Sequence, residues 1–185
     1  MAKGAAYLVK TYTGRLILDA DALNSLAYYR QDLQEVFSEK KCDVALTPHI
    51  KEFSRLSGMG TEDIVKEGMY AARAFAKAHG VTVLLKNASS VITDGNRTAV
   101  NTTGCSGQAK GGSGDVLSGV LAGLCAMGAS AFDGARLGAY IAGRAAEIAV
   151  EHTGEYSLTA TESIANLGRA FQELLVAENA DKNRG

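Results

Sequence analysis

Hydrophobic and polar residues follow two patterns along this chain. Short runs of β-branched and aliphatic residues predict buried strands, whereas apolar residues that recur every three to four positions predict helices. The alternation of the two patterns is typical of an α/β domain. The predicted strands lie at residues 15–18, 44–46, 81–86, 91–93 and 98–100. The predicted helices are two weak pieces before residue 38 and four longer ones, at 61–79, 114–127, 130–153 and from 159 onward.

The ends of these elements carry local signals that agree with the pattern. Thr61 can cap the helix that follows it, and Gly80 ends the same helix. Asp94-Gly95, between the last two strands, predicts a hairpin turn. We therefore expect one α/β domain over residues 1–178, with a central, mostly parallel sheet flanked by helices and with helices at the C-terminal end. Residues 179–185 are predicted to form a polar tail.

The overall composition excludes several classes of protein. The chain has 185 residues, and 19 lysines and arginines against 20 aspartates and glutamates give a formal net charge of −1. This balance gives no general attraction to nucleic acid or to an anionic membrane, so we expect neither as a partner. The three cysteines and three histidines are scattered, which excludes a disulfide framework and the common zinc spacings. The N-terminus lacks the apolar core of a signal peptide, and we expect a cytoplasmic protein.

Glycine is the exception in this otherwise ordinary composition. The 21 glycines make up about 11% of the chain, against a usual figure of roughly 7%, and eight of them lie between Gly104 and Gly128. Gly111, Gly112 and Gly114 stand directly before an apolar helical pattern. Glycines at this place let the backbone aim successive N–H groups outward and, with the helix dipole, form an anion site suited to phosphates. The alternative is a loop that serves close packing only.

Two side chains accompany these glycines. Ser113 completes the sequence Gly-Gly-Ser-Gly, and Asp115 follows in the first helical turn, where its carboxylate stays ionised. A carboxylate at this place could accept a proton from a substrate hydroxyl as a general base. The alternative is an ordinary acidic residue that stabilises the start of the helix.

Two further segments follow predicted strands, at the end where open α/β sheets place ligands. His49 belongs to a Thr-Pro-His segment after strand 44–46, and the polar segment Lys86–Ser90 follows strand 81–86. Each segment is either part of a ligand site or an ordinary exposed turn.

The remaining charged candidates are assigned ordinary structural roles. Asp19 and Asp21, after the first strand, could be metal ligands or acid–base groups, but turn chemistry is the preferred interpretation. Arg136, Arg144 and Glu147 on the long late helix are predicted to form a solvated face. No cluster of carboxylates identifies the ligands of a metal ion.

The glycine loop is also the centre of a family resemblance. Residues 111–119 (GGSGDVLSG) resemble the anion-hole and aspartate motif of the ribokinase-like superfamily. Within that superfamily, the chain most resembles the ADP-dependent NAD(P)H-hydrate dehydratase family, of the YjeF C-terminal-domain type. Three further blocks agree with that family in order and spacing: LILDADALN at 16–24, LTPHIKEFSRLSG at 46–58 and VLLKNASSVITDG at 83–95. NTTG at 101–104 resembles the family's lead-in to the glycine loop.

This resemblance implies a ribokinase-like fold and a repair lyase that converts hydrated nicotinamide cofactor, NADHX or NADPHX, back to NAD(P)H. It implies ADP or ATP as the phosphoryl donor and allows Mg²⁺ at the phosphates. Asp115 would be the catalytic residue and, together with His49, would contact the substrate. The nucleotide-binding residues implied by the resemblance are Lys86, Asn87, Ala88, Ser89, Ser90, Gly111, Gly112, Ser113 and Gly114.

The resemblance also predicts an incomplete domain. Members of the family resemble one another over a domain roughly half as long again, with several strands before the LDADALN block. A sheet that lacks this N-terminal part has an uncovered edge, so we expect a partner there. The partner would be a second copy of the chain, which makes a homo-oligomer, or a separately encoded N-terminal half. Two other functions stay open: a small-molecule kinase of the same superfamily, or a non-catalytic nucleotide-binding subunit.

Overall fold

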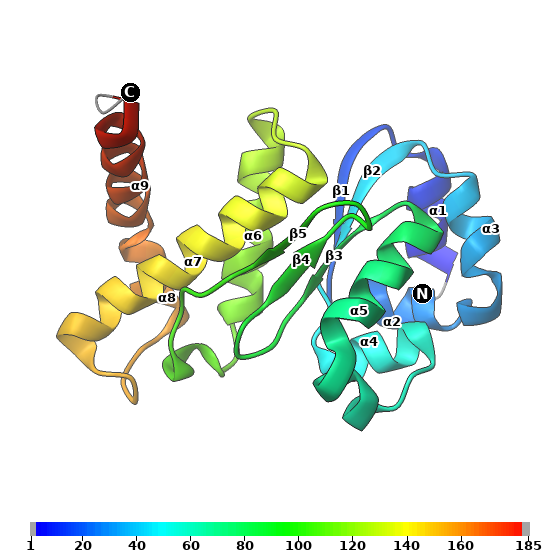
Figure 1. Ribbon diagram of the computed structural model, residues 1–185, viewed down its shortest axis with the longest axis horizontal. Coiled ribbons are helices and arrows are strands. Elements are labelled where there is room, and N and C mark those ends of the chain that lie inside the picture. Colours follow the sequence, from blue (N-terminus) through cyan, green and yellow to red (C-terminus); the bar gives the residue numbers. More distant parts are fainter. Residues whose placement is uncertain (1–2, 183–185) are drawn as a thin grey trace.

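The computed structural model describes residues 3–182, which form one five-stranded sheet with helices on both faces (Figure 1). The strands are β1 (Gly14–Leu18), β2 (Cys42–Leu46), β3 (Thr82–Leu85), β4 (Val91–Thr93) and β5 (Thr98–Val100). The helices before β3 are α1 (Lys3–Thr11), α2 (Asp21–Ala27), α3 (Leu33–Ser38), α4 (Ile50–Ser57) and α5 (Thr61–His79). The later helices are α6 (Ser113–Ala126), α7 (Ala131–Thr153), α8 (Ala160–Ala165) and α9 (Leu167–Lys182). Short 3₁₀ turns lie at Arg30–Asp32 and Ser106–Gln108.

The strands are hydrogen-bonded to one another in chain order, from β1 to β5. β1, β2 and β3 are parallel, with Leu18 opposite Leu46 and Ala45 opposite Thr82. β4 and β5 are antiparallel to their neighbours, as the predicted hairpin requires. The sheet is therefore mixed, and its three parallel strands all end at the same edge.

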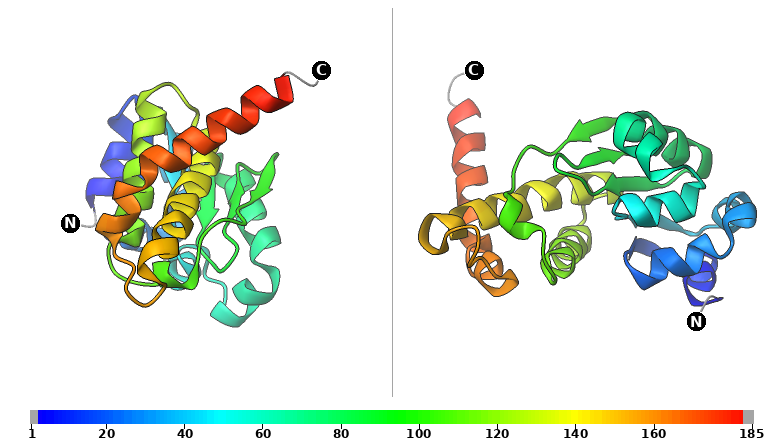
Figure 2. Two further views of the ribbon diagram at one scale, coloured as in Figure 1. Left: turned by 90° about the vertical axis from the view of Figure 1, so that its left-hand side faces the viewer. Right: turned by 90° about the horizontal axis from the view of Figure 1, so that it is seen from below.

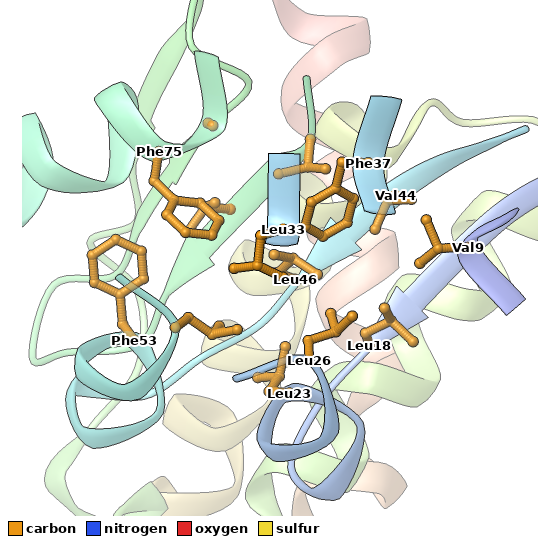
Figure 3. Packing of buried hydrophobic residues seen from close by; sticks show 14 of the residues in the cluster. Val9, Leu18, Leu23, Leu26, Leu33, Phe37, Val44, Leu46, Phe53 and Phe75 are labelled. Carbon is orange, nitrogen blue, oxygen red and sulfur yellow. The ribbon is translucent and has the colours of Figure 1, made fainter. Parts of the chain in front are cut away.

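Successive residues of the central strands face two different groups of helices. Val44 and Leu46 point into a core formed with α1 to α5, whereas Ala45 and Leu84 point into a second core formed with α6 and α7. In Figure 1 these two groups lie on opposite sides of the sheet. Figure 3 shows side chains from α1 to α5 meeting those of β1 and β2 in the first core. Burial on both faces explains why these strands are apolar throughout.

Two glycines of α7 bring it close to α6. A Cβ atom at Gly134 would lie 2.7 Å from Sγ of Cys125, and one at Gly138 would lie 2.5 Å from Cδ1 of Leu121. On its other flank, α7 packs against the first turns of α9 around Ala170. The rest of α9 projects away from the body of the protein (Figures 1 and 2).

The helices differ from the sequence-based expectation in four places. α1 and α4 were not predicted. The last predicted helix is interrupted at Asn166, which separates α8 from α9. α9 continues to Lys182, so the predicted polar tail begins within a helix, and its residues 183–185 lie outside the described residues. No helix in the described part is long and apolar enough to cross a membrane.

Candidate functional site

Each of the three parallel strands is followed by a polar residue at the same edge of the sheet. Asp19 follows β1, His49 lies three residues beyond β2, and Lys86 follows β3. The backbone N–H of Lys86 donates to the carbonyl oxygen of Pro48 at 2.8 Å, and His49 and Lys86 form an isolated parallel bridge. The two segments that the sequence singled out at His49 and Lys86 therefore lie side by side.

The glycine loop reaches the same edge and leads into α6. Gly112 is the N-cap residue, and its φ of 89° is a left-handed conformation that favours glycine. The N–H of Val116 donates to the carbonyl oxygen of Gly112 at 3.0 Å. The N–H groups of Ser113, Gly114 and Asp115 precede this bond and have no acceptor within the helix. Unpaired N–H groups at the positive end of a helix dipole favour an anion.

An ion pair joins the residues that follow β1 and β3, and a hydrogen bond links this pair to α6. Nζ of Lys86 donates to Oδ1 of Asp19 at 2.8 Å, and Oγ of Ser118 donates to Oδ2 of Asp19 at 3.1 Å. A Cβ atom at Gly114 would lie 3.6 Å from Oδ2 of Asp19 and 3.9 Å from Nζ of Lys86. Burial raises the pKa of Asp19, but the hydrogen bond and the charge of Lys86 outweigh it and hold this pKa below its ordinary value. The ammonium group of Lys86 is therefore fixed beside the predicted anion site.

The backbone immediately after Asp19 is strained. Ala20 has a φ of 49° and a ψ of −116°, and it is the one non-glycine residue with positive φ in the described part of the chain. A strained backbone conformation persists only where contacts with the surrounding structure enforce it, and such places are often functional sites. Here the N–H of Ala20 donates to Oδ1 of Asp19 at 2.9 Å, and the N–H of Ala22 donates to the carbonyl oxygen of Asp19 at 3.0 Å. Asp19 therefore makes the turn contacts that the sequence analysis favoured, and the same turn directs its carboxylate toward Lys86.

His49 is held by the helix that it begins. Nδ1 of His49 accepts hydrogen bonds from the N–H groups of Lys51 at 3.1 Å and of Glu52 at 3.2 Å. The N–H of His49 donates to Oε2 of Glu52 at 2.9 Å, and Oε1 of Glu52 lies 3.4 Å from Nε2 of His49. Because Nδ1 is an acceptor, the neutral ring carries its proton on Nε2. The side chain remains 49% exposed, so part of the ring is open to a ligand.

A cavity of about 1020 Å³ joins these segments, and this volume suits a nucleotide. Ser89 and Gly112 belong to the same loops but do not line the cavity. Asp115 is exposed on the first turn of α6 and does not line it either, so its catalytic role stays a prediction. Eight of the eleven predicted site residues do line it: His49, Lys86, Asn87, Ala88, Ser90, Gly111, Ser113 and Gly114.

The remaining wall of the cavity contains residues that the sequence analysis did not name as site residues. They come from the segment before the glycine loop and from small residues of α7. A Cβ atom at Gly143 would lie 2.3 Å from Oγ1 of Thr103 and 2.8 Å from its carbonyl oxygen, so glycine allows this segment to cross α7. The available signal was the run of small residues along the predicted helix 130–153. These wall residues include Asn101, Thr103, Gly104, Ala139, Ala142 and Gly143.

Polar contacts with later parts of the chain hold the glycine loop in place. Oγ1 of Thr103 donates to the carbonyl oxygen of Tyr140 at 3.0 Å. The ammonium group of Lys110 lines the cavity and also donates to the carbonyl oxygen of Leu158, between α7 and α8. The loop therefore depends on α7 and on the segment after it.

The solvated face predicted on α7 is correct for Arg136, which is exposed, but wrong for the other two residues. Oε1 of Glu147 accepts the N–H of Gly104 at 2.7 Å, and Oε2 of Glu147 accepts NH1 of Arg144 at 2.9 Å. The first of these contacts connects α7 to the start of the glycine loop across 43 positions of sequence, and no local pattern could have indicated it.

The described residues contain no group of three or more His, Cys, Asp or Glu side chains that could hold a metal ion. Two carboxylates do stand near the start of α6, those of Asp19 and Asp115. Magnesium is commonly bound by one or two carboxylates together with the phosphates of a nucleotide. The residues present therefore suit a magnesium ion that is held largely by a bound nucleotide.

Polar strand ends, a glycine loop at a helix start and a cavity of nucleotide size between them belong to an α/β protein with a ribokinase-like fold. Residues 2–168 match the family model described as NAD(P)H-hydrate dehydratase, and the chain belongs to this family. The chain is 41% identical over 140 residues to an ADP-dependent (S)-NAD(P)H-hydrate dehydratase of Cenarchaeum symbiosum. It is 39% identical over 152 residues to a bifunctional NAD(P)H-hydrate repair enzyme of Methanothermobacter thermautotrophicus.

A solved structure has the same fold. It is the ADP/ATP-dependent NAD(P)H-hydrate dehydratase of Bacillus subtilis, co-crystallised with ATP and Mg²⁺, with a TM-score of 0.78 and 27% identity. The match covers 89% of this chain and 57% of that one. The matches to the two relatives cover 76% and 80% of this chain, but only 46% and 28% of theirs. The chain therefore spans about half of these proteins or less.

Proposed function

We propose that this protein is an ADP-dependent dehydratase that converts hydrated nicotinamide cofactor, NADHX or NADPHX, back to NAD(P)H. The observation that supports this most strongly is the convergence of three distant segments on one cavity. His49 and residues from the segments 86–90 and 111–114 line it, and all three segments lie within the residues that match the dehydratase family model. The family match favours this reaction over that of a small-molecule kinase.

The proposed nucleotide site uses the glycine loop and the segment after β3. The N–H groups at the start of α6 would bind the phosphates of ADP or ATP, with the ammonium group of Lys86 beside them. Lys86–Ser90 would hold the rest of the nucleotide, and His49 would contact the hydrated nicotinamide. The names of the relatives, ADP-dependent in one case and ADP/ATP-dependent in another, support both donors.

In the proposed reaction, Asp115 takes the proton of the hydroxyl on the hydrated ring, while the oxygen of that hydroxyl attacks the terminal phosphorus of the nucleotide. The bond between that phosphorus and the nucleotide breaks, which leaves a phosphate ester and, from ADP, AMP. Loss of phosphate, together with a proton from the ring, restores the double bond of NAD(P)H. A magnesium ion bound with the nucleotide would neutralise phosphate charge.

The first test is calorimetric titration of the purified chain with ADP, ATP and AMP. Gly114→Asp should abolish binding, because its carboxylate would stand beside Asp19 and occupy the anion site. Gly119→Asp is the matched control: it adds the same charge to α6, and a side chain there meets no atom within 4 Å. Equal binding by both variants, or none by the unaltered chain at millimolar nucleotide, would contradict the proposed nucleotide site.

The second test is turnover of hydrated NADH with ADP. Asp115→Asn should retain ADP binding and lower the turnover by about 10²- to 10⁴-fold, which is the usual contribution of a general base. Unchanged turnover in an active preparation would show that Asp115 is not the base.

We also propose that the exposed edge of the sheet at β1 pairs with a second copy of the chain or with a separately encoded N-terminal half. β1 is the first strand of the sheet order, and one of its sides has no neighbouring strand among the described residues. Light scattering coupled to size-exclusion chromatography tests this, because a stable monomer at micromolar concentration would contradict the homo-oligomer. A cytoplasmic location is part of the same proposal, and the three free cysteines support it.

A further inference from the structure

We infer that Glu147 is a positioning residue of the nucleotide loop, and that Arg144 makes its position depend on the C-terminal helix α9. This inference rests on the proposed function, because it concerns the same cavity. It adds residues that touch neither nucleotide nor substrate but determine how well the site binds ADP.

Glu147 on α7 is hydrogen-bonded to the backbone of Gly104. The N–H of Gly104 donates to Oε1 of Glu147 at 2.7 Å, a short hydrogen bond to a charged acceptor. Gly104 has a φ of 115°, and a Cβ atom there would lie 2.6 Å from Oε1 of Gln108. The chain therefore enters the glycine loop from β5 at Gly104, in a backbone conformation that favours glycine, and this hydrogen bond ties it to α7 there. Because Gly104 also lines the cavity, this bond sets the position of part of the cavity wall.

Glu147 also forms an ion pair with Arg144 on the same helix. NH1 of Arg144 donates to Oε2 of Glu147 at 2.9 Å, and Nε of Arg144 donates to Oε2 of Glu173 on α9 at 2.7 Å. The hydrogen bond from Arg144 lowers the pKa of Glu173, so this carboxylate stays charged. The side chains of Arg144, Glu147 and Glu173 are 27%, 28% and 34% exposed, so solvent screens these contacts only in part. The carboxylate of Glu147 is thus held between the loop and a guanidinium group that α9 orients.

A second ion pair between the same two helices separates positioning from general stability. Glu151 lies one turn further along α7, and its Oε2 lies 3.7 Å from NH1 of Arg169 on α9. Both side chains are about half exposed, and neither lines the cavity. Loss of this pair would weaken the contact between α7 and α9, while Arg169 keeps its ion pair with Oε1 of Glu173 at 3.6 Å and Glu173 stays beside Arg144. Glu151 is therefore the matched control for Glu147.

The experiment measures the Kd for ADP by calorimetry and the midpoint of thermal unfolding for four variants. Glu147→Ala removes the acceptor of the Gly104 N–H and should raise the Kd about tenfold or more. Glu147→Gln keeps an oxygen for that N–H while losing the charge that pairs with Arg144. It should lower the unfolding midpoint about as much as Glu147→Ala but keep the Kd within about threefold of the original. Glu173→Gln acts through the same link to Arg144 and should raise the Kd about two- to threefold, no more than Glu147→Gln does, and Glu151→Ala should leave it unchanged.

Each result decides between two interpretations. If Glu147→Ala binds ADP as tightly as Glu151→Ala, the inference is overturned while the proposed function stands. If Glu147→Gln loses as much affinity as Glu147→Ala, the residue acts through general stability, and the positioning role is overturned. An unchanged Kd in Glu173→Gln overturns the dependence on α9. If the unaltered chain binds no ADP, the proposed nucleotide site fails, and this inference fails with it.

Discussion

Replacing Gly143 by alanine tests the contact between α7 and the segment before the glycine loop. The added Cβ atom would lie 2.3 Å from Oγ1 of Thr103, 2.7 Å from its carbonyl carbon and 2.8 Å from its carbonyl oxygen. The hydroxyl can rotate away, but the two backbone atoms cannot. Ordinary contact between such atoms needs about 3.5 Å, so the segment must move by roughly 0.7 Å or more. We expect the Gly143→Ala variant to lose both stability and affinity for nucleotide.

The size of the stability change follows from three contributions. Overpacking costs about 1–3 kcal/mol, and loss of the hydrogen bond from Thr103 to Tyr140 costs about 1 kcal/mol more. Alanine in place of glycine within a helix returns about 1 kcal/mol. The net loss is about 2 kcal/mol, which in a domain of this size lowers the midpoint of thermal unfolding by about 4–8 °C.

Gly119→Ala on α6 provides the control for this experiment. A Cβ atom at Gly119 meets nothing within 4 Å, so the variant keeps only the helix-propensity gain and should unfold about 2–4 °C higher than the unaltered chain. Thermal unfolding followed by circular dichroism measures both midpoints, and calorimetry measures the affinity for ADP. If both variants were stabilised equally, the close approach at Gly143 would be refuted, and with it the account of the cavity wall.

Three further predictions test other parts of the structure. Burial beside two phenylalanine rings lowers the pKa of His79 below 6.5. As the pH falls below about 6.5, the unfolded chain therefore takes up a proton before the folded chain does, and the free energy of unfolding falls. Urea unfolding from pH 7 to 5 should show a shallower pH dependence in His79→Gln, and an identical slope would contradict this. Gly95→Ala should lower the free energy of unfolding by about 3 kcal/mol, because Gly95 has a φ of 91° and its added Cβ atom would lie 2.6 Å from Cα of Lys77. Gly154 also has a positive φ but faces open space, so Gly154→Ala should lower it by only about 1–2 kcal/mol. Equal decreases in urea unfolding would rule out the clash at Gly95. Asp19→Asn should lower the free energy of unfolding by about 1–3 kcal/mol at pH 7. Because the pKa of Asp19 is lowered in the folded protein, the unaltered chain loses this extra stability as the pH falls below about 3.9 and through the folded-state pKa. A difference between the two chains that stayed constant down to pH 2 would contradict the ion pair with Lys86.

The sequence predicted the strands well because their signal is local. Buried strands such as β2 and β3 are apolar on both faces, and the Asp94-Gly95 turn between β4 and β5 needs only its own residues to be recognised. The glycine loop was equally recognisable, because its glycines and the apolar helix that follows them are adjacent in the sequence. α4 was missed because its N-cap residue is His49, and histidine is uncommon in that position.

The parts of the candidate site that were missed depend on contacts between distant residues. Asp19 and Lys86 are 67 positions apart, and nothing near either residue distinguishes an ion pair from two exposed turns. Gly143 looks like any other glycine of a helix until the position of Thr103 is known. Glu147 and Arg144 have the spacing of a solvated pair, and only the path of the segment at Gly104 assigns them another role. Local patterns identify which loops matter, whereas tertiary contacts determine what holds them.

The position of α7 in the chain has a consequence for the order of folding. The core beneath α1 to α5 is built from residues between Ala5 and Leu85, so it can close while the rest of the chain is still being synthesised. The cavity cannot, because Gly143 and Glu147 form and support its wall and leave the ribosome well after the glycine loop. A nucleotide bound as proposed would therefore stabilise only the finished protein and not its early intermediates. Damage to α7 would leave a chain that closes this first core but has one face of its sheet uncovered and no site.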